Sequence, residues 1–515
     1  MPIETPKINK WVVAMSVMLP TLIEIVDTSV VNVALNHIRG NLSAGIDEAT
    51  WVITSYLVSN AIVIPITGWL ANRFGRKRYL IFSIALFTSS SLMCGLAQSI
   101  TMLVFFRVLQ GIGGGALQPI SQAILLETFP PVEHGIAMAV FGIGIMFGPI
   151  IGPLLGGWIT DNMSWRWIFY INIPIGIIAV LMALFFIYDP SYIKRIKARV
   201  DYLGLMLLVI GLGSLQIVLD KGQREDWFNS NFIVTLAIVS SIALILFIVV
   251  ELFTKDPVVN LRVFKNISFS TGNIVMFSAF FNLFGSIVLL PIYLQTLMGY
   301  SATDAGMVLG PGGIATLIAM PIAGRLITKM NSKYLLTFGI IMSSYATLLM
   351  SRFSLYASFP VVIWPRIVLG IGMGFLFIPL TTLTLSTIRK QEMGNATAIY
   401  NLLRNLGGSF GVAFVTTMLS RRAQFHQVRL SEHITVFDRT FQFAHKGLEA
   451  ILPLRGIDSY TSQIASLKLL YGNLTRQASM MAFNDVFHLL SLFIICLVLL
   501  VPLMRRGKDV PTGMH

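Results

Sequence analysis

Charged residues and cysteine are both scarce in this sequence. Only 12% of its 515 residues are charged, against about 25% in a typical soluble protein. The two cysteines, Cys94 and Cys496, lie in apolar segments, so we expect neither a disulfide framework nor a metal site. The sequence has no Gly-x4-Gly-Lys-Ser/Thr loop and no visible nucleophile–base constellation. These absences exclude a self-contained ATP-driven pump and argue against an enzyme or a bound cofactor.

Long apolar runs take up most of the chain instead. Hydrophobic residues make up 55% of it, and the mean hydropathy is +0.77. A window of about 20 residues predicts fourteen membrane helices. They lie near residues 11–36, 48–71, 79–98, 101–126, 135–160, 166–188, 202–221, 231–253, 267–296, 303–328, 333–351, 358–384, 394–420 and 483–504. The first run is too long for a cleavable signal peptide, so we expect it to remain as a helix.

Basic residues gather in short loops, which explains the net charge of +14 without a nucleic-acid partner. They follow the second, sixth, eighth, tenth and twelfth helices and close the chain. With fourteen spans, all these loops lie on one side of the membrane. The positive-inside rule predicts that this side is cytoplasmic and that both termini lie there. We therefore expect a multi-pass protein of the cytoplasmic membrane.

Three short motifs recur in the two parts of the chain. Pro-Ile-x-Gly-x-Leu begins at Pro65 and Pro321, Arg-x3-Gly-x-Gly-x-Gly at Arg107 and Arg366, and Gly-x3-Gly at Gly148 and Gly407. The offsets are 256, 259 and 259 residues. They predict an all-α polytopic membrane protein built from two six-helix halves in parallel repeat. The halves comprise residues 1–190 and 263–515, and two extra helices are inserted in a linker at 191–262. Such repeats are typical of transporters that rock around a midplane site.

Two carboxylates, Glu24 and Asp27, interrupt the first apolar run. Ionisable groups at membrane depth are costly and mark functional sites by default. From the helical rise, Asp27 lies about 12 Å inside the outer end of its helix and Arg107 about 9 Å inside the outer end of the fourth. The shared depth predicts an Asp27–Arg107 interaction, and protonation of Asp27 would release Arg107. A static ion pair that only locks helices is the alternative.

The loop Gly68-Trp-Leu-Ala-Asn72-Arg73-Phe-Gly75-Arg76-Lys-Arg resembles the cytoplasmic signature loop of the major facilitator superfamily. Glycine permits the sharp turn, and the basic residues can contact helix ends and anionic membrane lipids. Asn72 stands where that family usually has an acidic residue, which predicts a hydrogen-bonded latch in place of a charge relay. The stretch from Arg107 to Gln110 resembles the same family's membrane-embedded arginine motif, which implies proton coupling by Asp27 and Arg107. Glu24 is not part of the family pattern, and it is a candidate for a second proton-coupling site or for a contact with a cationic substrate.

The fifth apolar run carries a ladder of glycines with two prolines. Its members are Gly144, Gly148, Pro149, Gly152, Pro153 and Gly156. Small residues at this spacing let helices pack closely, and proline allows bending. The Gly-Pro-x-x-Gly-Pro pattern resembles the signature of exporters in the superfamily, which implies antiport and a gating role for this helix. A generic packing face is the alternative.

Further stretches resemble the fourteen-helix drug:proton antiporter branch of the superfamily, the EmrB/QacA type, and within it the EmrB-like export permeases. They include Asp27–Leu35, Trp165–Gly176 and Asp201–Gly204. The resemblance implies a proton-driven exporter of lipophilic drugs or toxic compounds, with protons as the coupling ion and no other cofactor. Export of this kind confers antibiotic resistance. A proton-coupled uptake symporter of a small metabolite is the main alternative, and a membrane scaffold or sensor is another.

Aromatic residues offer a candidate drug pocket. The tentative set is Glu24, Gln110, Phe280, Phe281, Phe284 and Phe375, although aromatics in membrane helices also face lipid or neighbouring helices. We expect Arg404, in the cytoplasmic half of its helix, to snorkel to the surface.

The one large hydrophilic segment, residues 421–482, is predicted to lie outside the cytoplasm with weak helices at 441–452 and 462–480. Its histidines do not have metal-ligand spacing. A loop here resembles the EmrB-like subgroup, which implies a periplasmic membrane-fusion adaptor as partner and, through it, an outer-membrane channel. A self-capping or disordered loop is the alternative.

Overall fold

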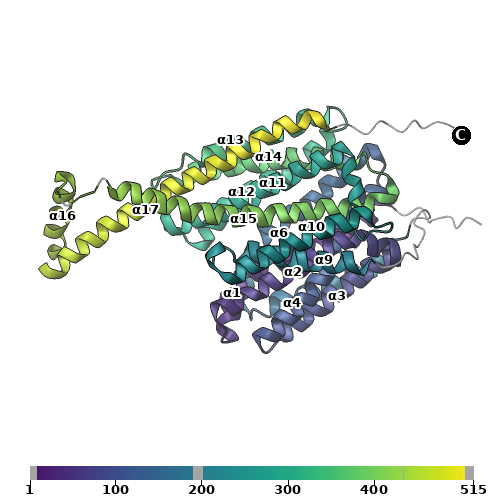
Figure 1. Cartoon of the computed structure of the whole chain (residues 1–515), viewed down its shortest axis with the longest axis horizontal. Coiled ribbons are helices and arrows are strands. Elements are labelled where there is room, and N and C mark those ends of the chain that lie inside the picture. The colour runs from purple at the N-terminus through teal and green to yellow at the C-terminus, as the bar shows by residue number, and fades with distance from the viewer. Residues whose placement is uncertain (1–8, 190–200, 433, 436, 457, 505–515) are drawn as a thin grey trace, which may run out of the picture.

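The computed structural model describes residues 9–189, 201–432, 434–435, 437–456 and 458–504, and within these ranges the chain is helical without strands (Figure 1). Thirteen of the described segments are long and apolar enough to cross a membrane. A further long helix, α15 (Met393–Glu432), matches the thirteenth predicted span, but its polar residues keep its hydropathy low. The count is compatible with the expected fourteen spans.

The first half contains six spans. They are formed by α1 (Lys10–Asn41), α2 (Ile46–Phe74), α3 (Arg76–Leu96), α4 (Ile100–Gly114) with α5 (Leu117–Thr128), α6 (His134–Asn162), and α7 (Trp167–Tyr170) with α8 (Asn172–Phe186). Side-chain caps set some of the starts, as where Ser99 accepts a hydrogen bond from the Met102 amide. Gly75 adopts φ 91° between α2 and α3, a backbone conformation that glycine reaches without the usual steric cost. The tight turn in the signature loop therefore depends on this glycine.

The two inserted helices, α9 (Tyr202–Lys221) and α10 (Asn231–Phe253), pack against each other. Helix α9 also contacts α2 in the first half and α15 in the second. The Gln216 amide donates to Ser409, and the Trp227 indole donates to Thr417, so this region is tied to α15 by side-chain hydrogen bonds. The insertion thus lies against both halves along one side of the molecule.

The second half repeats the architecture. It consists of α11 (Ile267–Ile292), continued by a π-turn at Tyr293–Leu297, and of α12 (Ala302–Leu326), α13 (Ser332–Met350), α14 (Phe359–Leu385), α15 and α17 (Ser459–Ile495), the last continued by η7 (Cys496–Leu503). Equivalent glycines make equivalent contacts in both halves. A Cβ atom on Gly113 would lie 2.6 Å from the Phe87 amide nitrogen, and one on Gly372 would lie 2.7 Å from that of Ser343. The predicted parallel repeat is confirmed at the level of packing.

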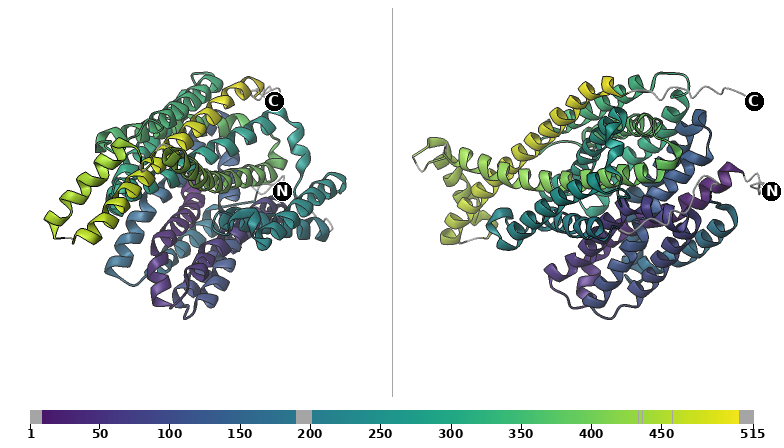
Figure 2. Two further views of the ribbon diagram at one scale, coloured as in Figure 1. Left: turned by 60° about the vertical axis from the view of Figure 1, so that its left-hand side comes forward. Right: turned by 45° about the vertical axis from the view of Figure 1, so that its right-hand side comes forward.

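Within its described residues, the hydrophilic segment 421–482 forms a helical arm. Helices occur near both predicted stretches, 441–452 and 462–480, but they are part of a larger helical structure than expected. Helix α15 continues to Glu432, α16 (Arg439–Ile451) follows, and α17 begins at Ser459, far from the apolar part of its span. At the base of the arm, Asp485 accepts a hydrogen bond from Arg422 at 2.7 Å and lies 2.7 Å from the His426 ring. The arm projects from the end of the body opposite to the start of α1 and the end of η7 (Figures 1 and 2).

Candidate functional site

Asp27 lies in the middle of α1 in a closed ring of hydrogen-bond donors. Its carboxylate accepts from Arg107 Nη1 at 2.7 Å, from the Gln110 amide at 3.0 Å and from the Asn172 amide at 2.7 Å. The Asp27 side chain is fully buried, and that of Arg107 is 1% exposed. The predicted Asp27–Arg107 interaction is therefore confirmed, and α4 and α8 both hold the carboxylate.

Arg107 is itself held from several directions. Its Nε donates to the Val52 carbonyl at 3.0 Å, and Nη1 also donates to Gln110 at 2.8 Å. The guanidinium lies 4.1 Å from the centre of the Tyr56 ring, a distance at which a cation is attracted to the aromatic face. A buried charge needs this degree of hydrogen bonding and pairing to be tolerated in the membrane interior.

Glu24 lies one helical turn before Asp27 but joins different partners. It accepts from the Tyr56 hydroxyl at 3.0 Å, from the Asn60 amide at 3.3 Å and from the Gln118 amide at 2.5 Å. Because the Tyr56 ring faces Arg107 while its hydroxyl reaches Glu24, this tyrosine lies between the two acidic sites. The two carboxylates thus belong to one connected polar network within the first half.

Arg404 extends this network to the second half, which corrects the expectation that it snorkels to the surface. Arg404 is buried on α15 and donates to the side-chain amide oxygen (Oε1) of Gln118. Gln118 on α5 therefore bridges Glu24 of one half and Arg404 of the other. A second hydrogen bond between the halves lies nearby, where the Asn401 amide donates to the side-chain oxygen of Gln122 at 2.6 Å. Arg404 faces inward because its partners lie across the interface.

The four phenylalanines of the predicted pocket do not share one environment. Phe280 lies near Arg404, with its ring centre 5.5 Å from the guanidinium carbon, and packs against Phe284. Phe281 packs against Phe414 and Phe493. Phe375 packs against Phe338, in a different part of the second half. The structure therefore brings Phe280 and Phe284 to the charged network, but not Phe281 and Phe375. Gln110 lies at Asp27 and not among the phenylalanines.

The glycine ladder of α6 packs directly on α1. Cβ atoms on Gly144, Gly148 and Gly152 would each lie within 2.3 Å of a side-chain atom of α1, and one on Gly156 would lie 3.1 Å from Val30. Pro149 and Pro153 lie within α6, but their side chains are outside the described part. The ladder therefore lets α6 approach the helix that carries both carboxylates.

Other residues of the signature loop make its polar contacts. No hydrogen bond joins the half-buried Asn72 side chain to another described residue, and the Asn72 latch stays a prediction. Arg76 pairs with Glu127 at the end of α5, and the Lys77 amide donates to Asp189 at 2.9 Å. Arg73 lies against the Trp69 ring.

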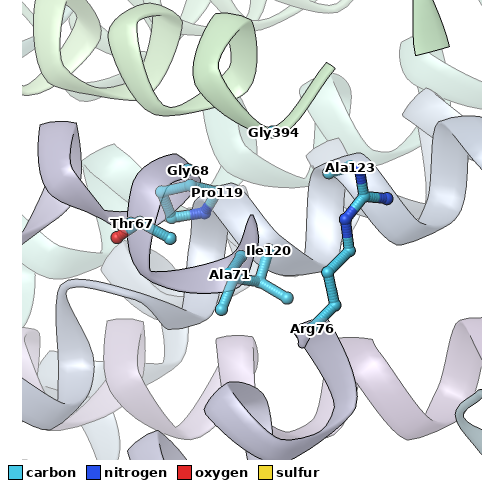
Figure 3. Close-up of a pocket in the computed structure, with 8 residues that line it drawn as sticks. All are labelled: Thr67, Gly68, Ala71, Arg76, Pro119, Ile120, Ala123 and Gly394. Carbon is cyan, nitrogen blue, oxygen red and sulfur yellow. The ribbon is translucent and has the colours of Figure 1, made fainter. Parts of the chain in front are cut away.

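Gly68 and Arg76 line a small pocket at the junction of the halves, together with Thr67, Ala71, Pro119, Ile120, Ala123 and Gly394 (Figure 3). A Cβ on Gly68 would lie 2.7 Å from the Asn395 Cα, and one on Gly324 would lie 2.8 Å from the Gly135 carbonyl oxygen. These two equivalent contacts bring α2 against α15 and α12 against α6. Among the described residues no cluster of metal-ligating side chains is present.

Several residues of the network were not identified in the sequence. Tyr56, Asn60, Gln118 and Asn172 are polar side chains in apolar runs, and this is the signal that could have found them. Each contacts a carboxylate in α1, so their importance depends on which helices neighbour α1. That information is absent from the hydropathy of any one helix.

Two halves that repeat one helical pattern and meet around buried charged residues are typical of membrane transporters. The chain belongs to the Major Facilitator Superfamily, whose pattern matches residues 17–412. It is thus a multi-pass membrane transporter and not an enzyme.

Its relatives cover nearly the whole chain. The multidrug export protein EmrB of Escherichia coli K12 is 39% identical over 489 residues, which are 94% of this chain and 93% of that protein. The fatty acid resistance protein FarB of Neisseria gonorrhoeae is 37% identical over 512 residues, 98% of each chain. The human organic anion transporter MFSD10 shares the fold with a TM-score of 0.59 at 13% identity, over 95% of this chain and 100% of that one.

Proposed function

We propose that the protein is a proton-driven antiporter that exports amphipathic, hydrophobic compounds across the cell inner membrane by alternating access. Full-length similarity to multidrug export proteins supports efflux of such compounds. The single observation that carries the coupling is the enclosed Asp27 carboxylate, which accepts three side-chain hydrogen bonds at membrane depth. Such a group is a functional site by default, because its burial is costly.

Asp27 couples proton uptake to the arrangement of the helices that hold it. When ionised, it binds Arg107 on α4 and Asn172 on α8. A proton on this carboxylate removes the charge that Arg107 neutralises and leaves a buried cation without its partner. Losing one member of a buried pair costs about 3–5 kcal/mol. That energy favours a second arrangement in which Arg107 is exposed or rebound, and this is the basis for coupling to a conformational change.

The Glu24–Gln118–Arg404 bridge links this event to the second half of the molecule. Glu24 and Arg404 lie on opposite sides of the interface and share Gln118 as a hydrogen-bond partner. Rocking of the halves separates these residues, so the bridge belongs to the closed interface. Phe280 lies beside Arg404, and Phe284 packs against Phe280. Together they supply an apolar wall for a lipophilic compound.

The helical arm supports a periplasmic partner. It lies at the end of the molecule opposite to the start of α1 and the end of η7, so with cytoplasmic termini it extends into the periplasm (Figure 1). Helix α16 presents no buried residues and carries an exposed Phe443. The arm is the proposed contact for a membrane-fusion adaptor that connects to an outer-membrane channel.

Transport direction separates this function from proton-coupled uptake. In proteoliposomes with an imposed pH gradient, antiport drives a lipophilic compound toward the more acidic side, whereas symport drives it toward the more alkaline side. The glycine ladder of α6 against α1 favours antiport, because the signature that it carries resembles that of exporters. Accumulation on the alkaline side would contradict the proposal. Replacement of α16 by a short Gly-Ser linker is expected to leave this exchange intact and to abolish co-purification with an adaptor.

A further inference from the structure

The internal repeat places Arg366 at the position of Arg107. Arg107 is the eighth residue of α4, which begins at Ile100, and Arg366 is the eighth residue of α14, which begins at Phe359. Both are followed by the same glycine pattern. Both arginines are therefore set at one depth by the same helix geometry, and the surroundings of the two can be compared directly.

The carboxylate that neutralises Arg107 has no counterpart beside Arg366. The same offset of 259 residues carries Asp27 to Ser286 in α11. Ser286 is fully buried and accepts a hydrogen bond from Arg366 Nη1 at 3.2 Å. The second half thus keeps the arginine and its contact but has a neutral hydroxyl at the place of the acid.

Arg366 remains a buried cation without a counter-charge in the described part of the chain. Its Nε is buried and makes no hydrogen bond there, whereas the Nε of Arg107 donates to a carbonyl. Two carboxylates of the second half are engaged elsewhere: Asp304 accepts from Ser301, and Asp485 pairs with Arg422. An uncompensated buried charge is strongly unfavourable.

The position of Arg366 is built into the packing of α12 against α14. A Cβ on Gly312 would lie 2.8 Å from Arg366 Cγ, so glycine in α12 makes room for the arginine stem. Arg366 is 8% exposed, compared with 1% for Arg107. The difference is consistent with the missing carboxylate, which covers the guanidinium in the first half.

We infer that Arg366 and Ser286 form an anion-binding site in the second half that takes a compact monoanion. The anion lies beside the guanidinium of Arg366, where it accepts from the free Nε and from the Ser286 hydroxyl. The Ser286 hydroxyl, which donates to the Leu283 carbonyl at 2.8 Å, can turn its proton to the ligand. Chloride and the carboxylate head group of an amphipathic acid share this chemistry. The site does not depend on the proposed direction of transport.

The test is the thermal stability of the purified full-length protein in detergent, titrated with chloride, acetate or octanoate. Sodium gluconate at equal ionic strength is the bulky reference anion, and octanamide is the neutral match for octanoate. The wild-type Tm is expected to rise by about 2 °C or more with chloride or acetate relative to gluconate, because a ligand of the folded state stabilises it. Octanoate acting at lower concentration than acetate would identify the amphipathic acid as the ligand, and equal potency would identify the free anion.

Two substitutions at Ser286 decide the assignment. Ser286→Asp supplies the missing carboxylate and is expected to raise the Tm in gluconate and to remove the response to anions. Ser286→Asn is the neutral control and should keep the response, while Arg366→Gln should lose it. An equal wild-type Tm in all salts, or an unchanged anion response in Ser286→Asp, would overturn the site.

Discussion

Asp27 and Glu24 are three residues apart on α1, yet they contact different parts of the molecule. Asp27 binds only residues of the first half and is enclosed by Arg107, Gln110 and Asn172. Glu24 reaches Arg404 of the second half through Gln118. The first carboxylate is therefore suited to sensing protonation, and the second to joining the halves.

At this scale we predict strong coupling between Asp27 and Arg107. Arg107→Gln leaves a buried carboxylate without its cation and is expected to cost about 3–5 kcal/mol of stability. Adding Asp27→Asn to that variant should restore much of the loss, because two neutral side chains can hydrogen-bond to each other. A thermal-unfolding double-mutant cycle measures this coupling. Additive effects of the two substitutions would contradict a functional ion pair.

The sequence allows the Asp27–Arg107 pair to be predicted, but not the role of Arg404. Helical rise gives the depth of a residue in the membrane. Equal depth was sufficient to predict the pairing of Asp27 with Arg107. For Arg404 depth suggested snorkelling, whereas the deciding factor was which helix it faces. Its partner Gln118 lies in the other half of the chain. Such long-range pairing cannot be read from one helix.

At the scale of single helices, the close contact of α6 with α1 depends on glycine. We predict that Gly148→Val disrupts it, because even a Cβ there would lie 2.2 Å from Ile25 Cγ2 and 3.0 Å from the Ile25 carbonyl carbon. Gly157→Val is the matched control on the same helix, since a Cβ at Gly157 meets nothing within 4 Å.

The yield of folded protein and the Tm are measured for the two variants. Substrate exchange in proteoliposomes is then measured for each variant that folds. Gly148→Val should lower the Tm by several degrees, as expected for overpacking of about 1–3 kcal/mol, and Gly157→Val should behave as wild type. Equal effects of both substitutions would show that the ladder is a generic small-residue surface.

Helix type and repeat were predictable because membrane helices carry a strong hydropathy signal. The arm was not, because α15 and α17 continue beyond their apolar parts as polar helices that end at Glu432 and begin at Ser459. A helix surrounded by water does not need a run of apolar residues, because its backbone hydrogen bonds are made within the helix itself. A hydropathy profile therefore ends such helices too early.

At the scale of the whole molecule, the halves are closed against each other at the end away from the arm. Gly68 contacts Asn395, and Gly324 contacts Gly135. Gly68 and Gly324 occupy equivalent positions in the two halves of the repeat. Their symmetry indicates that both must open for the halves to rock. The loop glycines of the signature motif thus act by allowing close contact between halves as well as by forming a turn.

We predict that Gly68→Val opens this interface. Its side chain would collide with the α15 backbone, so the small pocket lined by Ala123 should become accessible (Figure 3). A cysteine placed at position 123, in a background without Cys94 and Cys496, is expected to react with a maleimide several-fold faster in Gly68→Val. Gly310→Val, where a Cβ meets nothing within 4 Å, serves as the control. Unchanged labelling in Gly68→Val would show that this contact does not hold the halves together.

The most direct test of coupling compares two transport modes in the same proteoliposomes. Asp27→Asn is expected to retain exchange of labelled for unlabelled substrate at equal pH and to lose accumulation driven by a pH gradient. Asp161→Asn, at a carboxylate whose side chain is 71% exposed, is the control and should keep both modes. Gradient-driven accumulation by Asp27→Asn at the wild-type level would contradict the assignment of proton coupling to Asp27.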